Sequence, residues 1–424
     1  MANDAWARNG VLYRVDARLF RDGDGDGVGD IGGLASGMEY LHWLGVDGVW
    51  VTFDEAPPDP AYDGLLPVAR QHAMGLADGA AWRRLTAEAH RWGLRVVIDG
   101  WAEADRVRRE GGRALRDDRP GGRGGPRSDL SLRMAFDNGI DAVWAADGWA
   151  MPGPHDRPAR WMQGTAPVAE RTSVATSPVR IHAMFEQDAL GRGARGRAAP
   201  WTTRSLALAL HAIDGRRAAA DSPLLLLGPV NAPRAAGFLG PELVRVAAVL
   251  LLTTPGTATV VSGDEIGLRD GDGVVRPRPY GRTGPPERAA MAWDERPGGG
   301  FASWPLAPLV SAGVEPVSRQ RNDPDSLLAL YRRAIALRRS ERAIAEGRLT
   351  PVAVGDGLLA VLREDGGERF LVALNTTPAP VVVASLAGLT GHVALSTCRR
   401  PEGTRVAGHL RLEPYSAMVI RLGV

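Results

Sequence analysis

The chain has 424 residues, 24% of them charged, and a formal net charge of only +2 at pH 7. This length is sufficient for a large core and for more than one domain. The near balance of charge argues against a nucleic acid partner held mainly by electrostatic attraction. The single cysteine, Cys398, excludes an internal disulfide framework and a zinc site built from cysteines.

The N-terminal segment and the most apolar segment both predict a soluble, cytoplasmic protein without a membrane partner. Residues 1–8 lack the charged-then-apolar order of a secretion signal. The apolar run at residues 246–253 is far shorter than the ~20 residues of a membrane-spanning helix, and Pro255 and Gly256 follow it.

Strand-like and helix-like segments alternate along most of the chain. Residues 11–15 form a β-type run, after which Leu34, Met38 and Leu41 follow at helical spacing. Another helix is predicted at residues 82–92. Further strands are predicted at residues 46–51, 94–99, 141–146, 179–185, 224–228 and 258–262. Repeated strand–helix units of this kind predict a parallel sheet with right-handed crossovers, for which a barrel is the natural closure.

The pattern changes after an amphipathic helix that is predicted to begin at about Ser326. Its inward face is expected to consist of Leu327, Leu330, Tyr331, Ala334 and Leu337, and its outward face of Arg332, Arg333, Arg338 and Arg339. Short β-rich runs between residues 358 and 422 are then separated by Gly, Asp and Pro. These runs predict a small antiparallel β domain.

Several ordered landmarks resemble glycoside hydrolase family 13, the α-amylase and α-glucosidase superfamily, and in particular its oligo-glucosidase and trehalose-synthase-like branch. Residues 12–20 resemble the first barrel strand, residues 22–30 a calcium loop, residues 255–267 the last barrel strand and residues 320–328 the lead into the last helix. The resemblance implies an α/β fold, a (β/α)8 TIM barrel over residues 1–345 and a C-terminal antiparallel β-sandwich over residues 346–424. The family's lid insertion is shortened here to about residues 103–129.

The resemblance implies one structural calcium ion and no organic cofactor. The predicted ligands are the side chains of Asp22, Asp24, Asp26 and Asp30 and the backbone carbonyl of Val28. Such hard oxygen ligands suit calcium, and the interleaved glycines allow a tight turn. The alternative interpretation is a solvated acidic turn without an ion.

The family's nucleophile is missing from the strand that should carry it. A retaining glycosidase needs two carboxyl groups about 5 Å apart. The nucleophile strand of the family aligns with residues 142–146, which places Ala146 at the nucleophile position and Trp144 at the position of the supporting Arg. Asp147 follows one residue later and faces the opposite side of the strand unless a bulge intervenes.

The other catalytic positions implied by the resemblance have also changed. Asn231 stands where the family has its third carboxylate, and Asn cannot carry the charge. Ala183 lies where the acid/base Glu is expected, and Glu186 is the nearest acid, again through a bulge. Asp99 alone remains of the motif that follows the third strand.

Some pocket residues of the family persist. Tyr62 and Asp63 resemble its stacking Tyr and hydroxyl-binding Asp, and an aromatic face beside a carboxylate suits a sugar; the alternative is a structural relic. Trp144 either fills the former sugar site or stacks on a different ligand. The predicted ligand pocket consists of Tyr62, Asp63, Asp99, Trp144, Asn231 and Arg234.

Three functional hypotheses follow. The first is a pseudoenzyme that has lost glycosidase activity and acts by binding a small saccharide or an active paralogue. The second is an enzyme repurposed for another reaction, with Asp147, Asp63, Asp99 or Glu186 as acid or base. The third is a residual α-glucosidase that uses Asp147 and Glu186, which requires two independent bulges.

Overall fold

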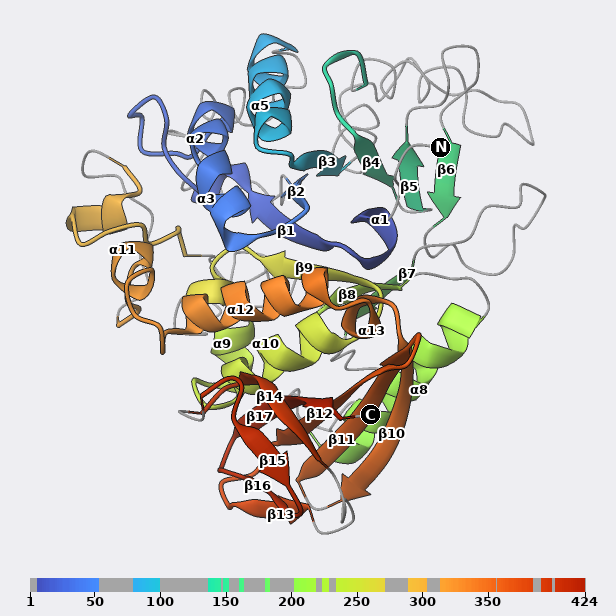
Figure 1. The fold of residues 1–424 in the computed structure, drawn as a ribbon. Helices are drawn as coiled ribbons and strands as arrows, with labels where there is room; N and C mark the ends of the chain where they lie inside the picture. Colours follow the sequence, from blue (N-terminus) through green and yellow to red (C-terminus); the bar gives the residue numbers. More distant parts are fainter. Residues whose placement is uncertain are drawn as a thin grey trace, which may run out of the picture.

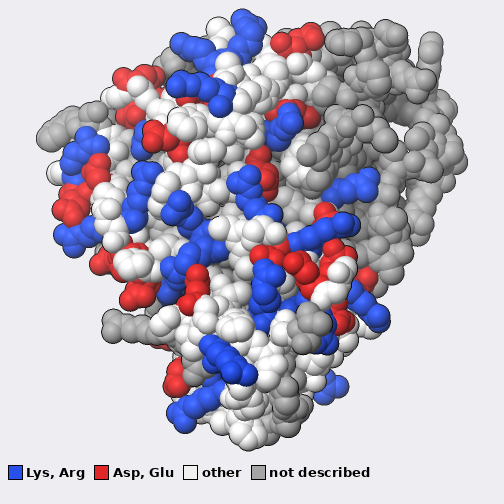
Figure 2. Space-filling model, viewed as in Figure 1, with Lys and Arg blue, Asp and Glu red and all other residues white. Residues whose placement is uncertain are grey.

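The computed structural model describes residues 6–52, 79–99, 136–145, 148–151, 160–163, 180–183, 202–218, 223–228, 234–270, 289–302, 313–355, 357–383, 390–398 and 401–423. Among these residues, no helix combines the length and the apolar character needed to cross a lipid bilayer. Charges of both signs are interspersed over the face seen in Figure 2.

The first part of the chain forms a 9-stranded sheet in the order β6-β5-β4-β3-β2-β1-β9-β8-β7. Its parallel strands are β1 (Val11–Asp16), β2 (Gly48–Thr52), β3 (Arg95–Asp99), β4 (Ala142–Ala145), β7 (Arg180–Ala183), β8 (Pro223–Leu226) and β9 (Thr257–Val261). β5 (Gly148–Met151) and β6 (Arg160–Gln163) extend it beyond β4 as antiparallel strands. The parallel sheet and its strand positions thus follow the sequence pattern, whereas β5 and β6 were not anticipated.

Both faces of the sheet are buried, as expected for parallel strands. Val11, Tyr13 and Val15 face a large core shared with the helices. Leu12 and Trp50 belong instead to a second apolar cluster on the opposite face. The alternation follows from the two-residue period of a strand.

Helices pack around this sheet (Figure 1), most of them outside it, while the first lies on the face of Leu12 and Trp50, because Ala7 belongs to their cluster. They are α1 (Trp6–Asn9), α2 (Ile31–Ser36), α3 (Met38–Leu44), α5 (Gly79–Arg91), α8 (Thr203–Ala218), α9 (Ala235–Leu239), α10 (Leu243–Thr253), α11 (Val317–Gln320), α12 (Leu327–Ser340) and α13 (Arg342–Ala345), with the 3-10 turns η1 (Ala17–Leu19), η2 (Asp264–Ile266) and η3 (Pro297–Gly300). The helical spacing around Leu34 and Met38 proves to be two helices divided at Gly37. A Cβ at Gly37 would lie 2.3 Å from a ring carbon of Phe20, so this close approach requires glycine.

Helix α12 begins where the sequence predicts it. Ser326 is its N-cap, and its hydroxyl oxygen accepts a hydrogen bond from the backbone N–H of Ala329 at 3.0 Å. One expectation is wrong: Arg338 does not face solvent but is 1% exposed. Its guanidinium donates to the carbonyl oxygens of Asn9, Leu252, Thr254 and Gly256. A helical pattern predicts that such an arginine is exposed, because the sequence does not reveal carbonyl acceptors from distant segments.

The C-terminal part consists of two antiparallel sheets. The larger has the order β10-β11-β12-β17-β14-β15 and the smaller pairs β13 with β16. The strands are β10 (Arg348–Gly355), β11 (Leu358–Asp365), β12 (Glu368–Asn375), β13 (Val381–Val383), β14 (Thr390–Ser396), β15 (Arg405–Ala407), β16 (Leu410–Leu412) and β17 (Ser416–Leu422). An apolar cluster that includes Leu371, Leu410 and Ile420 joins the two sheets. Phe370 and Val419 belong to the large core instead, and α10 contacts both β12 and β17.

Candidate functional site

The carboxyl ends of the parallel strands meet along one edge of the sheet, where enzymes of this architecture place their reacting groups. The register pairs Asp16 with Thr52 and Asp99 with Trp144 at the ends of neighbouring strands. Ala183 pairs with Leu226 at the same ends of β7 and β8. Three of the predicted site residues, Asp99, Trp144 and Ala183, therefore do lie at strand ends.

The chain turns back directly after β4. Trp144 pairs with Asp99 on one side and with Trp149 of antiparallel β5 on the other, and Ala145 pairs with Gly148. A hairpin therefore follows the strand that the resemblance assigns to the nucleophile, where a repeating strand–helix pattern leads into a helix.

Six predicted site residues lie outside the described residues, and the structure does not bear on them. They are Tyr62, Asp63, Ala146, Asp147, Glu186 and Asn231.

The acid at the end of β1 already has a partner. Asp16 is 6% exposed, and its carboxylate accepts hydrogen bonds from the backbone N–H and the side chain of Arg18. The two oxygens of Asp16 are thereby held in a local cap of η1, which is a structural role.

Two buried carboxylates follow β9, and the sequence prediction did not single them out. Glu265 accepts hydrogen bonds from the hydroxyls of Tyr13 at 2.7 Å and Tyr40 at 2.8 Å and from the backbone N–H of Gly263 at 2.8 Å. Burial raises the pKa of Glu265. Asp264 accepts from the backbone N–H of Ala235 at 3.0 Å, and burial raises the pKa of Asp264 to about 7. The signal was present in the Gly-Asp-Glu-Ile-Gly segment, which was interpreted only as a strand landmark.

Arg234, which is predicted to line the ligand pocket, is a buried cation with partners in the fold. It is 4% exposed and forms an ion pair with Asp270. Its Nε donates to the carbonyl oxygen of Ser262, and its backbone N–H donates to Asp270 Oδ2 at 2.8 Å. These contacts fasten the start of α9 to the segment that follows β9.

The predicted calcium loop gathers carboxylates. Oxygens from Asp22, Asp24 and Asp30 lie within 4.8 Å of one another. Asp26 is not in this group, and its Oδ1 accepts a 2.8 Å hydrogen bond from the backbone N–H of Val28. Three convergent carboxylates form the kind of hard oxygen set that suits a calcium ion.

The backbone of this loop holds the acids in place. Asp22 accepts from the N–H groups of Gly25 at 2.6 Å and Gly27 at 2.9 Å, and both glycines have a positive φ. Burial raises the pKa of Asp24, and the charges of the neighbouring carboxylates add to this rise, while a hydrogen bond from the backbone of Asp26 opposes it. A bound cation would offset the repulsion among these charges.

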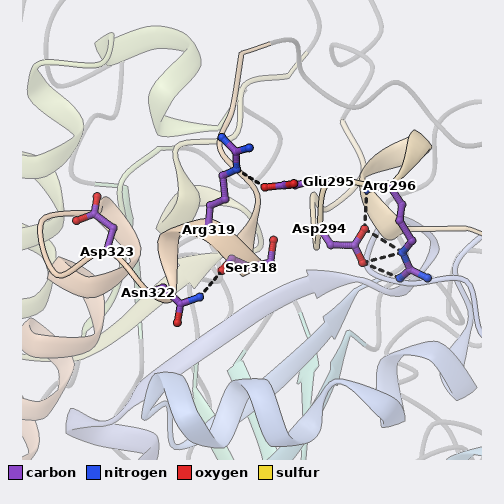
Figure 3. A pocket seen from close by; sticks show the side chains of 7 residues that line it. All are labelled: Asp294, Glu295, Arg296, Ser318, Arg319, Asn322 and Asp323. Atoms are coloured by element: carbon purple, nitrogen blue, oxygen red, sulfur yellow. Dashed lines mark hydrogen bonds and ion pairs between the residues drawn. The ribbon is translucent and has the colours of Figure 1, made fainter.

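An open groove of about 770 Å³ lies between the 294–296 segment and α11 (Figure 3). Its cations have partners: Arg296 Nη2 lies 2.6 Å from Asp294 Oδ2, and Arg319 pairs with Glu295. Asn322 donates to the carbonyl oxygen of Ser318 at 3.0 Å. The groove is lined by Asp294, Glu295, Arg296, Ser318, Arg319, Asn322 and Asp323. Its charges largely neutralise one another, so the groove presents no unpaired guanidinium to a ligand.

Comparison with known proteins identifies the protein family that has this fold. The sequence matches the family "Alpha amylase, catalytic domain" over residues 15–102 and 222–347, just over half of the chain. The chain belongs to this family.

Particular relatives add detail. The chain is 25% identical to the "Probable alpha-glucosidase" of Rhizobium meliloti (strain 1021), with 87% of this chain and 89% of that protein covered. It is 35% identical to an amino acid transporter heavy chain from Oryctolagus cuniculus, over 43% of this chain and 34% of that one.

Two solved structures share the fold along the whole chain. The trehalulose synthase from Pseudomonas mesoacidophila MX-45 superposes with a TM-score of 0.70 at 17% identity, with 99% of each chain covered. An isomaltulose synthase mutant from Erwinia rhapontici NX5, in complex with D-glucose, gives 0.73 at 17% identity, also with 99% of each chain covered. These likenesses support the TIM-barrel fold.

Proposed function

We propose that this α-amylase-family protein is a pseudoenzyme: it has lost glycosidase activity and binds a small saccharide or a protein partner. The observation that carries the proposal is the set of residues at the three family carboxylate positions, which are Ala146, Ala183 and Asn231. None of these side chains can act as a nucleophile or as an acid/base group in glycoside hydrolysis.

The acids whose side chains the structure describes at the carboxyl edge support this proposal, since they are already engaged. Asp16 is bound by Arg18, Asp264 accepts from Ala235 N–H, and Glu265 accepts from two tyrosines. A substitute nucleophile must reach the anomeric carbon, and buried carboxylates held by the protein's own donors are poorly placed to do so.

A sugar-binding role draws support from the residues that persist. Tyr62 and Asp63 supply an aromatic face and an acceptor. Trp144, at the end of β4 beside Asp99 in register, supplies a second aromatic group. A protein-partner role draws support from the relative named as the heavy chain of an amino acid transporter, whose name describes an assembly role.

Calcium binding by the 22–30 loop forms part of the proposal. Asp22, Asp24 and Asp30 would supply side-chain oxygens, and the carbonyl of Val28 would complete the set. The ion would be structural, because it would fasten the loop that joins β1 to α2. The chemistry of the sheet edge would not involve it.

Residual α-glucosidase activity is the second candidate, favoured by the similarity to the Rhizobium meliloti protein along most of both chains. Calorimetric titration with maltose and trehalose, run beside a product assay, separates the two candidates. Saccharide binding without product formation supports the pseudoenzyme. Product formation supports the second candidate. A protein that binds neither sugar and forms no product points to a different substrate or to a protein partner.

A further inference from the structure

A second cavity, of about 470 Å³, lies in the helical layer outside the sheet. It is bounded by α9, the start of α10, the η2 turn and the segment that leads into α12. Its apolar wall includes Val244, Ile266 and Leu327, and its charged groups are Arg245, Arg269 and Glu315. Its lining residues belong to helices, turns and connecting segments, and none of them lies in a strand.

Two arginines, Arg245 and Arg269, line this cavity. Within the ranges that the structure describes, neither Arg245 nor Arg269 donates a hydrogen bond or joins an ion pair. Arginines nearby do have partners: Arg234 pairs with Asp270, and Arg333 pairs with Glu402 at 3.1 Å. Arg245 and Arg269 differ from them in that two arginines without an ion pair among the described residues line one cavity.

The remaining polar groups of the wall are already committed to the fold. Gln320 Nε2 donates to the carbonyl oxygens of Ile266 at 2.9 Å and Glu315 at 2.8 Å, while its Oε1 accepts from Leu328 N–H. Ser326 donates to the carbonyl of Gln320 at 2.7 Å. These bonds engage two polar side chains of the wall, whereas the guanidinium groups of Arg245 and Arg269 donate no hydrogen bond among the described residues.

Two arginines and one glutamate are the charged residues that line the cavity. Arg245 is half-buried in the first turn of α10, and its pKa is lowered first by burial and then by the nearby charge of Arg333. Asp323 and Asp325 oppose this effect from a distance, without a hydrogen bond to Arg245. Glu315 is exposed at the rim. A bound anion would restore the interactions that the half-buried guanidinium loses with water.

We infer that this cavity binds the phosphate or carboxylate group of a small organic anion. Arg245 and Arg269 would hold the oxyanion, because the planar guanidinium fork matches both groups. The apolar wall formed by Val244, Ile266 and Leu327 would contact the body of the ligand. The volume falls within the range of small-molecule sites.

Calorimetric titration of the full chain at low salt tests the inference, with glucose 6-phosphate, glucuronate and glucose as probes. We expect the two anions to bind with at least tenfold higher affinity than glucose at this site. Arg245→Gln and Arg269→Gln should each weaken anion binding at least tenfold. Arg296→Gln and Arg319→Gln, in the groove of paired charges, should change it less than twofold.

The three probes distinguish which chemical group of a ligand the cavity binds. Preference for glucose 6-phosphate over glucuronate assigns the site to phosphate, and the reverse assigns it to carboxylate. Glucose binding that survives Arg245→Gln belongs to the saccharide site of the proposed function. The inference is overturned if neither anion binds, or if both anions bind Arg269→Gln as tightly as they bind the parent protein. Arg269 is exposed, so we expect this variant to fold.

Discussion

The hydroxyl of Tyr13 donates a 2.7 Å hydrogen bond to the carboxylate of Glu265, and both side chains are fully buried. This contact links β1 to the η2 turn that follows β9. Tyr40 of α3 donates a second hydrogen bond to the same carboxylate at 2.8 Å. A buried acid near the family's catalytic edge thus serves to join the sheet to its helical layer.

Removal of the Tyr13 hydroxyl tests this structural role. Tyr13→Phe should lower the free energy of unfolding by about 1–3 kcal/mol, because Glu265 loses a donor while the ring volume is kept. Urea unfolding measures the change. Tyr415→Phe is the matched control, since the Tyr415 hydroxyl has no partner among the described residues, and it should stay within about 0.5 kcal/mol. Equal effects of the two substitutions would count against the role of Glu265.

The buried Asp264 predicts a dependence of stability on pH. Its pKa of about 7 in the folded protein lies above the ordinary value of 3.8, because burial disfavours the charge. The folded state therefore holds the proton more tightly, and this contribution to stability is complete below about pH 4 and lost as the pH rises toward 7. Asp264→Asn cannot ionise and keeps an acceptor for Ala235 N–H.

Unfolding curves of both proteins across this pH range provide the measurement. The unfolding free energy of the parent should fall relative to that of Asp264→Asn by up to about 1.4 kcal/mol per pH unit. Parallel pH profiles would show that Asp264 does not titrate in this range.

The buried Arg338 predicts a large mutational effect. Its guanidinium satisfies four carbonyl oxygens from two separate segments, at Asn9 and at residues 252–256. Arg338→Met should lower the unfolding free energy by more than about 3 kcal/mol, since it leaves several buried acceptors unpaired. Arg332→Met, on the exposed side of the same helix, serves as the control and should cost less than about 1 kcal/mol. A small effect at Arg338 would mean that water replaces the guanidinium.

Much of the fold could be predicted from the sequence, because the spacing of apolar residues and the residues that begin and end helices and strands are local features. Neighbouring residues alone were enough to predict β3, from its apolar run, and the start of α12, from its N-cap Ser326. Arg338 and Arg234 could not be placed in this way, because their acceptors come from distant parts of the chain. The sequence does not predict the β4–β5 hairpin for a related reason. The pattern at residues 142–145 predicts a strand but not whether the neighbouring strand is parallel or antiparallel.

The acidic loop predicts a calcium-dependent stability. A chelator should lower the Tm by several degrees if the folded chain alone binds the ion. Asp24→Asn should abolish this response, because it removes one of the convergent carboxylates. Asp26→Asn should retain most of it, since Asp26 Oδ1 is engaged by Val28 N–H. An unchanged Tm on chelation of the parent protein would argue for a solvated acidic turn.

Hydrolysis of para-nitrophenyl α-D-glucoside by the purified chain is the most direct measurement of the central claim. The proposed assignment of Ala146, Ala183 and Asn231 to the family carboxylate positions predicts no release of nitrophenol above the buffer rate, and no change on Asp147→Ala or Glu186→Gln. Turnover by the parent that either substitution abolishes would contradict the pseudoenzyme and establish a glycosidase with relocated carboxylates.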